Sequence, residues 1–197
     1  MKLARDFYLR DVNTIARDLI GKILVHETHE GITSGIIVET EAYRGPDDKA
    51  SHTYNNKRTV RTEIQYKKGG FAYIYLIYGI YYCFNVTVNE PDKPEAILIR
   101  ALEPLEGIPL MMTRRRTRKL KDLCNGPGKL CAALAINKNS YGADLCGNNL
   151  YIRDDGKFYD IMTSPRINID YAEEYKFLHW RYYAADNIYV SKSHKKN

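Results

Sequence analysis

Apolar residues recur along the chain at two spacings, and the spacing predicts which segments are helices and which are strands. Over residues 12–20 they recur every three or four positions, which predicts a helix that Gly21 ends. Segments 22–29 and 32–43 are rich in β-branched residues, and the Glu30-Gly31 pair between them indicates a hairpin turn. The first part of the chain therefore predicts one helix followed by two antiparallel strands.

Further strands and helices are predicted in the middle of the chain. Residues 71–88 are dominated by aromatic and β-branched side chains, which predicts two strands that turn near Tyr78-Gly79. Residues 96–103 predict another strand, and Pro104 is placed to open a helix directly after it. A second helix is predicted to begin after Pro127.

Beyond residue 150 the pattern predicts only short strands, at 150–154, 165–169, 176–183 and 187–191. The chain shows no repeat, no low-complexity linker and neither βαβ alternation nor a G-x-G-x-x-G motif, which argues against a doubly wound nucleotide-binding fold. We predict a single α+β domain over residues 1–190 with a largely antiparallel sheet, followed by a disordered basic tail over 191–197.

Composition adds one unusual feature to an ordinary globular profile. The 197 residues are 44% hydrophobic and 27% charged, which argues against disorder, collagen and coiled coil. Seventeen Tyr stand against five Phe and one Trp. Because Tyr combines an apolar ring with a polar tip, this excess suits partly wet surfaces that bind flat ligands.

The net charge of +6 is concentrated in three segments. Residues 57–68, 114–129 and 191–197 carry +4, +6 and +3, so the rest of the chain carries −7. This asymmetry indicates a surface for a polyanion such as nucleic acid. A solvated loop remains the favoured interpretation of the tail and an equal alternative for 114–129.

The sequence offers no pattern for a metal, a cofactor or a membrane. The four Cys form no C-x-x-C pair and are interpreted as small buried hydrophobes, and the five His form no ligand spacing, so we expect neither metal nor cofactor. Apolar runs are too short for a membrane span, and charges interrupt the N-terminal residues, which argues against a signal peptide. We expect a reduced, cytoplasmic protein that does not bind membranes.

Candidate chemistry lies at the end of the strand predicted over 32–43. Alternation places Glu39, Glu41 and Tyr43 on one face, just before a Gly-Pro loop that ends in Ser51-His52. A carboxylate beside an aromatic wall can act as a general base toward water. Taken alone, the segment is better explained as an edge strand whose glutamates face solvent.

The neighbouring strands carry residues that could line a slot the size of a nucleobase. Alternation places Tyr73 and Tyr75 on one side, Asn85 with Tyr81 and Cys83 on another, and Leu98 beside Arg100. Cross-strand packing is the alternative explanation for such a tyrosine stripe.

Four ordered motifs, VETEAYRGPDDKASH, YIYLIYG, AILIRALEPLEG and LCNGPGKLCAALAINK, resemble those of the alkylpurine DNA glycosylase family of the 3-methyladenine or alkyladenine type. The resemblance runs from about residue 16 to about residue 191. It implies a monofunctional, metal-free, monomeric enzyme of base excision repair, built as one compact domain with a curved antiparallel sheet flanked by helices. Its partner would be double-stranded DNA containing damaged purines: 3-methyladenine and 7-methylguanine, with hypoxanthine and ethenoadenine as further candidates.

The resemblance also implies roles for individual residues. Glu41 matches the general base that activates water, and Arg100 matches the basic residue beside it. The matched base-contacting residues are Tyr43, His52 and Tyr75, with Asn85 crowding the amino group of guanine and Leu98 on the pocket floor. Tyr78 matches the residue that wedges into the minor groove, and the expected DNA contacts are Arg58, Arg61, Lys67, Gly126 and Lys129.

Two other functions fit parts of the same pattern. A non-catalytic nucleic-acid-binding module would keep the basic face and the aromatic slot, but it would have no need for Glu41. A carbohydrate hydrolase using Glu39 and Glu41 is disfavoured, because carboxylates two positions apart on one strand face lie about 6–7 Å apart side by side. That arrangement does not place them on opposite sides of a sugar ring.

Overall fold

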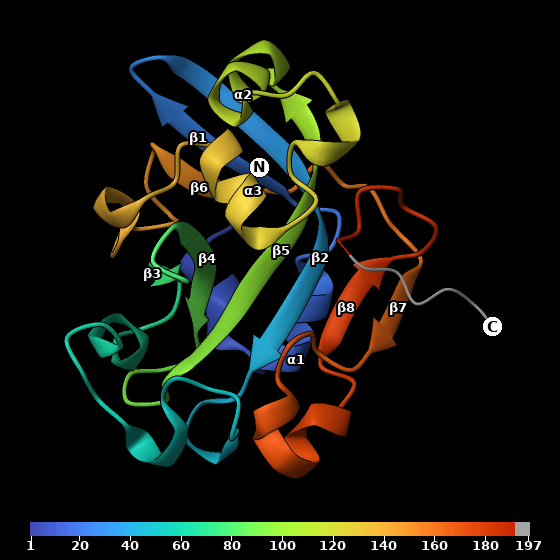
Figure 1. Ribbon diagram of the computed structural model, residues 1–197. Coiled ribbons are helices and arrows are strands. Elements are labelled where there is room, and N and C mark those ends of the chain that lie inside the picture. Colours follow the sequence, from blue (N-terminus) through green and yellow to red (C-terminus); the bar gives the residue numbers. More distant parts are fainter. Residues whose placement is uncertain (192–197) are drawn as a thin grey trace.

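The computed structural model describes residues 1–191, in which eight strands form one sheet whose pairings are all antiparallel (Figure 1). Six strands follow the order β3-β4-β5-β2-β1-β6, while β8 joins β2 to β7. The strands are β1 (Ile23–Thr28), β2 (Gly31–Tyr43), β3 (Ala72–Ile77), β4 (Tyr81–Val88), β5 (Glu95–Glu106), β6 (Leu150–Arg153), β7 (Ile161–Ser164) and β8 (Arg181–Ala184).

Helices cover both faces of the sheet, and the chain forms the single α+β domain that the sequence predicts. The helices are α1 (Val12–Asp18), α2 (Ile108–Arg115) and α3 (Pro127–Ala133). Figure 1 shows α3 in front of β4 and β5 and α1 behind the sheet. Asp11 caps α1 by accepting a hydrogen bond from the backbone N of Thr14, and the apolar stripe of α1 packs into the main core.

The long strand β2 lies in the interior of the sheet over Ser34–Ile36 and again over Glu39–Glu41. Strand β5 pairs with one side of β2, while the other side pairs first with β1 and then, over Glu39–Glu41, with β8. Both glutamates are fully buried. The interpretation of an edge strand with solvent-facing glutamates is therefore wrong, because β8 covers this half of the strand from the other end of the sequence.

The helix expected to open at Pro104 begins later. Strand β5 continues through Pro104 to Glu106, and α2 starts at Ile108 after Gly107, whose φ of 73° suits glycine. Beyond Leu98, β5 pairs only with β2, so its other side is an edge. Proline is tolerated at such an edge because no partner strand needs its missing N–H group.

The C-terminal strand predictions are confirmed only in part. Segment 150–154 contains β6, and 176–183 overlaps β8, but 165–169 and 187–191 form no strands, and β7 was not predicted. Pro165 ends β7, and Asn168 adopts a φ of 59°, which breaks an extended segment. Short apolar alternations of this kind occur in loops as readily as in strands. The tail predicted to be disordered lies outside the described residues except for Ser191.

Two further expectations concern cysteines and membranes. Cys83, Cys124 and Cys131 are buried and Cys146 is partly exposed, so three of the four behave as the buried hydrophobes that were predicted. Burial raises the pKa of the Cys131 thiol well above its usual range.

No helix within residues 1–191 has the length and apolar character needed to cross a membrane.

Candidate active site

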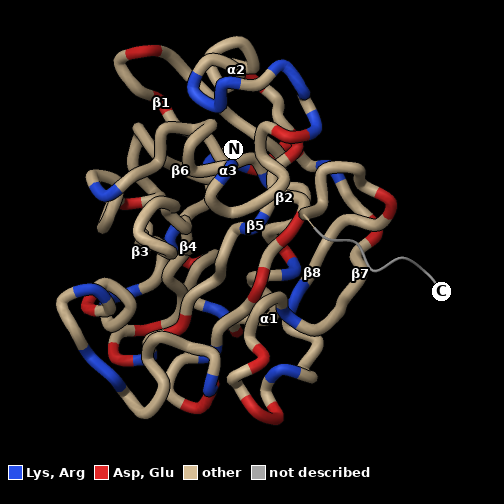
Figure 2. The backbone as a smooth tube through the Cα atoms, viewed as in Figure 1, with Lys and Arg blue, Asp and Glu red and all other residues tan. Residues whose placement is uncertain are grey.

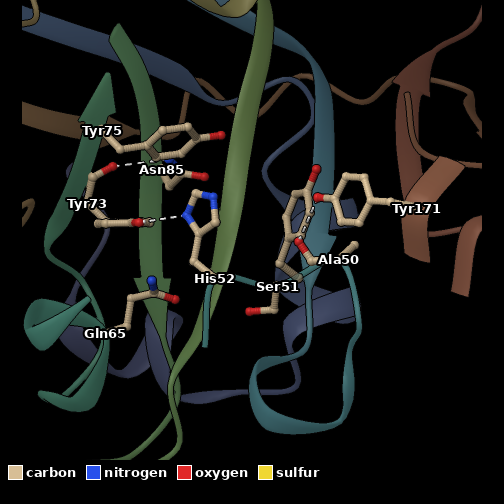
Figure 3. Close-up of a pocket in the computed structure, with 10 residues that line it drawn as sticks. Ala50, Ser51, His52, Gln65, Tyr73, Tyr75, Asn85 and Tyr171 are labelled. Atoms are coloured by element: carbon tan, nitrogen blue, oxygen red, sulfur yellow. Dashed lines mark hydrogen bonds between the residues drawn. The ribbon is translucent and has the colours of Figure 1, made fainter. Parts of the chain in front are cut away.

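A cleft of about 690 Å³ lies where the β3–β4 hairpin faces the ends of β2 and β5 and the start of α3. A deeper cavity of about 50 Å³ shares Tyr43, His52, Tyr75 and Tyr171 with the cleft (Figure 3). The predicted residues that line the cleft are Tyr43, His52, Tyr75, Tyr78, Leu98, Arg100, Arg61, Gly126 and Lys129. Asn85 lines the deeper cavity.

One aromatic wall consists of His52 and the tyrosines of β3. The rings of His52 and Tyr75 meet edge to face with centroids 4.7 Å apart, and His52 Nδ1 is hydrogen-bonded to the hydroxyl of Tyr73 at 2.8 Å. Figure 3 shows these rings on one side of the pocket and Tyr171 on the other. Tyr171 was not singled out in the sequence, where it lies in a segment without a strand or helix pattern.

His52 is neutral at physiological pH. Burial lowers its pKa to about 4, and the positive charges of Arg61 and Lys57 act in the same direction. A neutral imidazole does not repel a positively charged ligand, so this wall is compatible with a cationic aromatic molecule.

Glu41 lies directly behind the cleft and is held by residues that line it. Its Oε1 accepts a hydrogen bond from the backbone N of Ile167 at 2.7 Å. Its Oε2 accepts from the Tyr43 hydroxyl at 2.8 Å and from Arg100 Nη1 at 3.3 Å. Each carboxylate oxygen can accept about two hydrogen bonds. Oε1 therefore keeps capacity for a further donor such as a water molecule.

Tyr43 and Arg100 stay protonated in these contacts. Burial raises the pKa of the Tyr43 phenol well above its usual range, and the charge of Glu41 adds to this effect. For Arg100, burial lowers the pKa, but Glu41 and Glu39 more than compensate and raise it. Both side chains are consequently donors toward Glu41.

A buried network extends behind Glu41. Glu39 Oε1 accepts from Arg181 Nε at 2.7 Å and from Arg100 Nε at 3.1 Å. Glu39 Oε2 accepts from the backbone N of Ser191 at 2.7 Å. Two carboxylates and two guanidinium groups thus balance in charge, with Arg100 bridging Glu39 and Glu41. Glu39 was predicted to share a face with Glu41 and to be a candidate for sugar hydrolysis, whereas no role was predicted for Arg181.

A second buried ion pair supports the ring of Tyr43. Both Nη atoms of Arg166 bond to the carboxylate of Asp48, and both side chains are fully buried. The Arg166 guanidinium lies 4.7 Å from the Tyr43 ring centroid and 5.1 Å from that of Trp180. Arg166 was not among the predicted site residues, because residues 165–169 were predicted to form a strand. A charged residue within this apolar segment was the available signal.

Tyr78 stands at the exposed tip of the β3–β4 hairpin. Tyr78 and Gly79 lie in the three-residue connection between Ile77 and Tyr81 and have φ values of 54° and 70°. Positive φ is unusual for a residue with a large side chain. The Tyr78 side chain is 76% exposed, and Ile80 beside it is 66% exposed. The turn therefore displays an aromatic ring at the mouth of the cleft.

The basic segments are only partly directed toward the cleft. Figure 2 shows the two described segments at different ends of the molecule, one beyond α2 and one on the loop before β3. Arg61 belongs to segment 57–68, on the loop before β3, and Arg115 and Lys129 belong to segment 114–129. All three side chains line the cleft. By contrast, Arg114 is turned inward and donates to the carbonyl of Ala133 at 3.0 Å.

Two of the residues expected to bind DNA lie outside the cleft lining. Arg58 pairs with Glu63 and Asp92 and stacks on Tyr66, while Lys67 is exposed on the same loop. Within residues 1–191, no three His, Cys, Asp or Glu side chains cluster as a metal site would require.

Comparison with known proteins shows similarity over almost the entire chain. The model of the Methylpurine-DNA glycosylase family matches residues 6–188. A protein of Natranaerobius thermophilus is 50% identical over 196 residues, which cover 97% of this chain and 99% of that protein. A protein of Desulfitobacterium hafniense (strain Y51) is 48% identical over 199 residues, covering 96% and 98%. Both carry the name "Putative 3-methyladenine DNA glycosylase".

Proposed function

Because this chain belongs to the methylpurine-DNA glycosylase family, it is a DNA glycosylase, and we propose that it releases alkylated purines from duplex DNA. The proposed substrates are 3-methyladenine and 7-methylguanine. The enzyme acts as a monomer and without lyase activity, leaving an abasic site. The observation that carries the proposal is the position of Glu41, whose Oε1 has spare acceptor capacity behind a cleft with aromatic walls.

The cleft suits a base that has left the helix. A purine inside a duplex cannot reach a buried carboxylate, so the damaged nucleotide must first be flipped out. Tyr43 and Tyr75 offer ring faces to the extruded base. A purine alkylated at N3 or N7 is cationic, and a cation over an aromatic face gains about 0.5–2 kcal/mol. The neutral state of His52 avoids repulsion with this charge.

Hydrolysis then needs one proton transfer at Glu41. Water donates a hydrogen bond to Oε1, Glu41 takes its proton, and the water oxygen bonds to C1′ of the sugar. The bond from C1′ to the purine nitrogen breaks, and its electron pair leaves with the base, which thereby loses its positive charge. The negative charge of Glu41 also stabilises the oxocarbenium-like transition state. Tyr43 and Arg100 hold the carboxylate in place through Oε2.

The DNA backbone would lie across the mouth of the cleft. Arg61, Arg115 and Lys129 line this mouth and would contact phosphates, giving affinity without sequence preference. Tyr78 would fill the gap left by the flipped nucleotide, as side chains do that insert between base steps in the minor groove.

The test is release of free base from a methylated duplex. The protein is incubated with the duplex, free purines are separated by chromatography, and the DNA is then cleaved with alkali at abasic sites. We expect free 3-methyladenine and an equal yield of alkali-sensitive sites. A protein that binds the duplex and releases no base would instead be a nucleic-acid-binding module, and the proposal would be wrong.

A further inference from the structure

Gln65 places an unpaired amide donor beneath the aromatic slot. It lies in the 3₁₀ turn Glu63–Tyr66, and its side chain is only 2% exposed. Within residues 1–191 no acceptor lies within hydrogen-bond distance of its Nε2 atom, and the Tyr73 hydroxyl is near enough to interact with it electrostatically. Leaving a buried amide donor unpaired is unfavourable, because the group has lost its hydrogen bonds to water. A ligand atom that reaches Gln65 would recover this free energy.

Gln65 lines the deep cavity of about 50 Å³ together with His52 and Asn85. Three other polar atoms of the lining residues, the Ser51 hydroxyl, His52 Nδ1 and Asn85 Nδ2, each bond to protein atoms. Figure 3 shows the Gln65 amide pointing into the pocket below His52 and Tyr73. The Gln65 amide is therefore available to hydrogen-bond a ligand that enters the deep cavity.

The geometry of a purine decides which of its atoms arrives there. N9 carries the sugar and stays toward the DNA backbone, so the opposite edge, with N1 and the substituent on C6, enters the slot first. We propose that Gln65 recognises the 6-substituent of the flipped purine, directly or through one water molecule. A water molecule needs a cavity of roughly 10–15 Å³. The deep cavity of about 50 Å³ therefore has room for a bridging water molecule as well as for a direct contact with the 6-substituent. This inference rests on the proposed function.

An amide suits this task because it both donates and accepts. Nε2 can donate to the 6-oxo group of guanine-type or hypoxanthine-type bases, while Oε1 can accept from the 6-amino group of adenine-type bases. Turning the amide end over exchanges the two roles. Gln65 would thus allow one pocket to accept both classes of purine, and a residue with only one role would discriminate between them.

The test compares release of 3-methyladenine, a 6-amino purine, with release of 7-methylguanine, a 6-oxo purine, from the same methylated duplex under single-turnover conditions. In its ionised form the side chain of the variant Gln65→Glu presents only acceptors, so we expect release of 7-methylguanine to fall at least tenfold relative to that of 3-methyladenine. Gln65→Met presents neither role, so release of every base that the wild type removes should fall at least fivefold. Affinity for an abasic duplex, which has no base to recognise, should stay unchanged in both variants.

Tyr66→Phe is the matched control. The Tyr66 hydroxyl lies in the same turn, is buried without a partner among residues 1–191, and does not line the cavity. The release rates of this variant should equal those of the wild type. Unaltered rates in Gln65→Met, or an equal loss of abasic-duplex affinity in both Gln65 variants, would overturn the assignment. A wild-type protein that releases no base would refute the proposed function instead, so the two failures are distinguishable.

Discussion

Arg100 Nη1 lies 3.3 Å from Glu41 Oε2, on the side of the carboxylate opposite the oxygen with spare acceptor capacity. The guanidinium is thus placed to hold Glu41 while leaving Oε1 accessible to a water molecule. This division of the two carboxylate oxygens makes the identity of residue 41 testable.

Replacing Glu41 by Gln should abolish catalysis and preserve binding. The amide keeps the size of the side chain but cannot take a proton from water, and general-base catalysis typically contributes 10²–10⁴-fold. We expect single-turnover release of 3-methyladenine to fall by about that factor or more, while affinity for an abasic duplex stays within about threefold. Release at the wild-type rate would remove Glu41 from the mechanism.

Replacing Glu39 by Gln should weaken both the fold and the reaction. The change leaves two buried guanidinium groups with one carboxylate, and breaking a buried ion pair costs about 3–5 kcal/mol. We expect this loss in urea unfolding, with slower base release because Arg100 loses its second anchor. The double variant Glu39→Gln/Arg181→Met restores the charge balance and should recover part of the stability. Equal stability of the single variant and the wild type would show that the network contributes nothing.

Strand alternation predicted which residues share a face within one strand, and the family resemblance predicted which of these faces meet at one pocket. Tyr43, Tyr75, Asn85 and Leu98 lie in four different strands, and all of them line the cleft or the deeper cavity. Pairing between distant segments was not accessible in this way. Strand β8 joins Glu39 from more than 140 positions away, and this pairing is what buries the glutamates.

Charge patterns also left the direction of individual side chains open. Arg114 and Arg115 are adjacent at the end of α2, yet Arg115 lines the cleft and Arg114 is bonded to Ala133 and Glu30. Neighbouring positions on a helix point about 100° apart, so a run of like charges cannot all face one partner. Gln65 was missed for a different reason: it lies in a short turn with no periodic pattern.

Replacing Tyr78 by Asn should stabilise the protein and weaken DNA binding. Asn tolerates the positive φ of this position better than Tyr does, so relief of strain should add about 1 kcal/mol to the free energy of unfolding. Loss of the ring should lower affinity for an abasic duplex about tenfold, since stacking on a base contributes about 1–3 kcal/mol. Phe158→Ala is the control, because Phe158 is an exposed aromatic residue outside the cleft. Unchanged affinity in Tyr78→Asn would reduce Tyr78 to a turn residue.

Salt dependence should separate the phosphate contacts from the structural arginines. Each phosphate contact contributes about 0.9 to the slope of log K against log salt. Arg61→Gln and Lys129→Gln should each reduce this slope by about that amount without a change in stability. Arg114→Gln should leave the slope unchanged and lower stability, because the Ala133 carbonyl and Glu30 lose their donor. A reduced slope in Arg114→Gln would mean that this side chain turns outward on DNA.

The depressed pKa of His52 predicts how stability depends on pH. The folded pKa is about 4 and the ordinary value is 6.5, so between these values the unfolded chain binds a proton that the folded protein does not. The contribution of His52 is therefore fully present above pH 6.5 and is lost as the pH falls toward 4, by up to about 3 kcal/mol. The variant His52→Gln should show a shallower loss of unfolding free energy over this range. The variant His26→Gln should be compared over the same pH range, because burial lowers the pKa of His26 in the same direction. Parallel curves for wild type and His52→Gln would mean that His52 titrates normally in the folded protein.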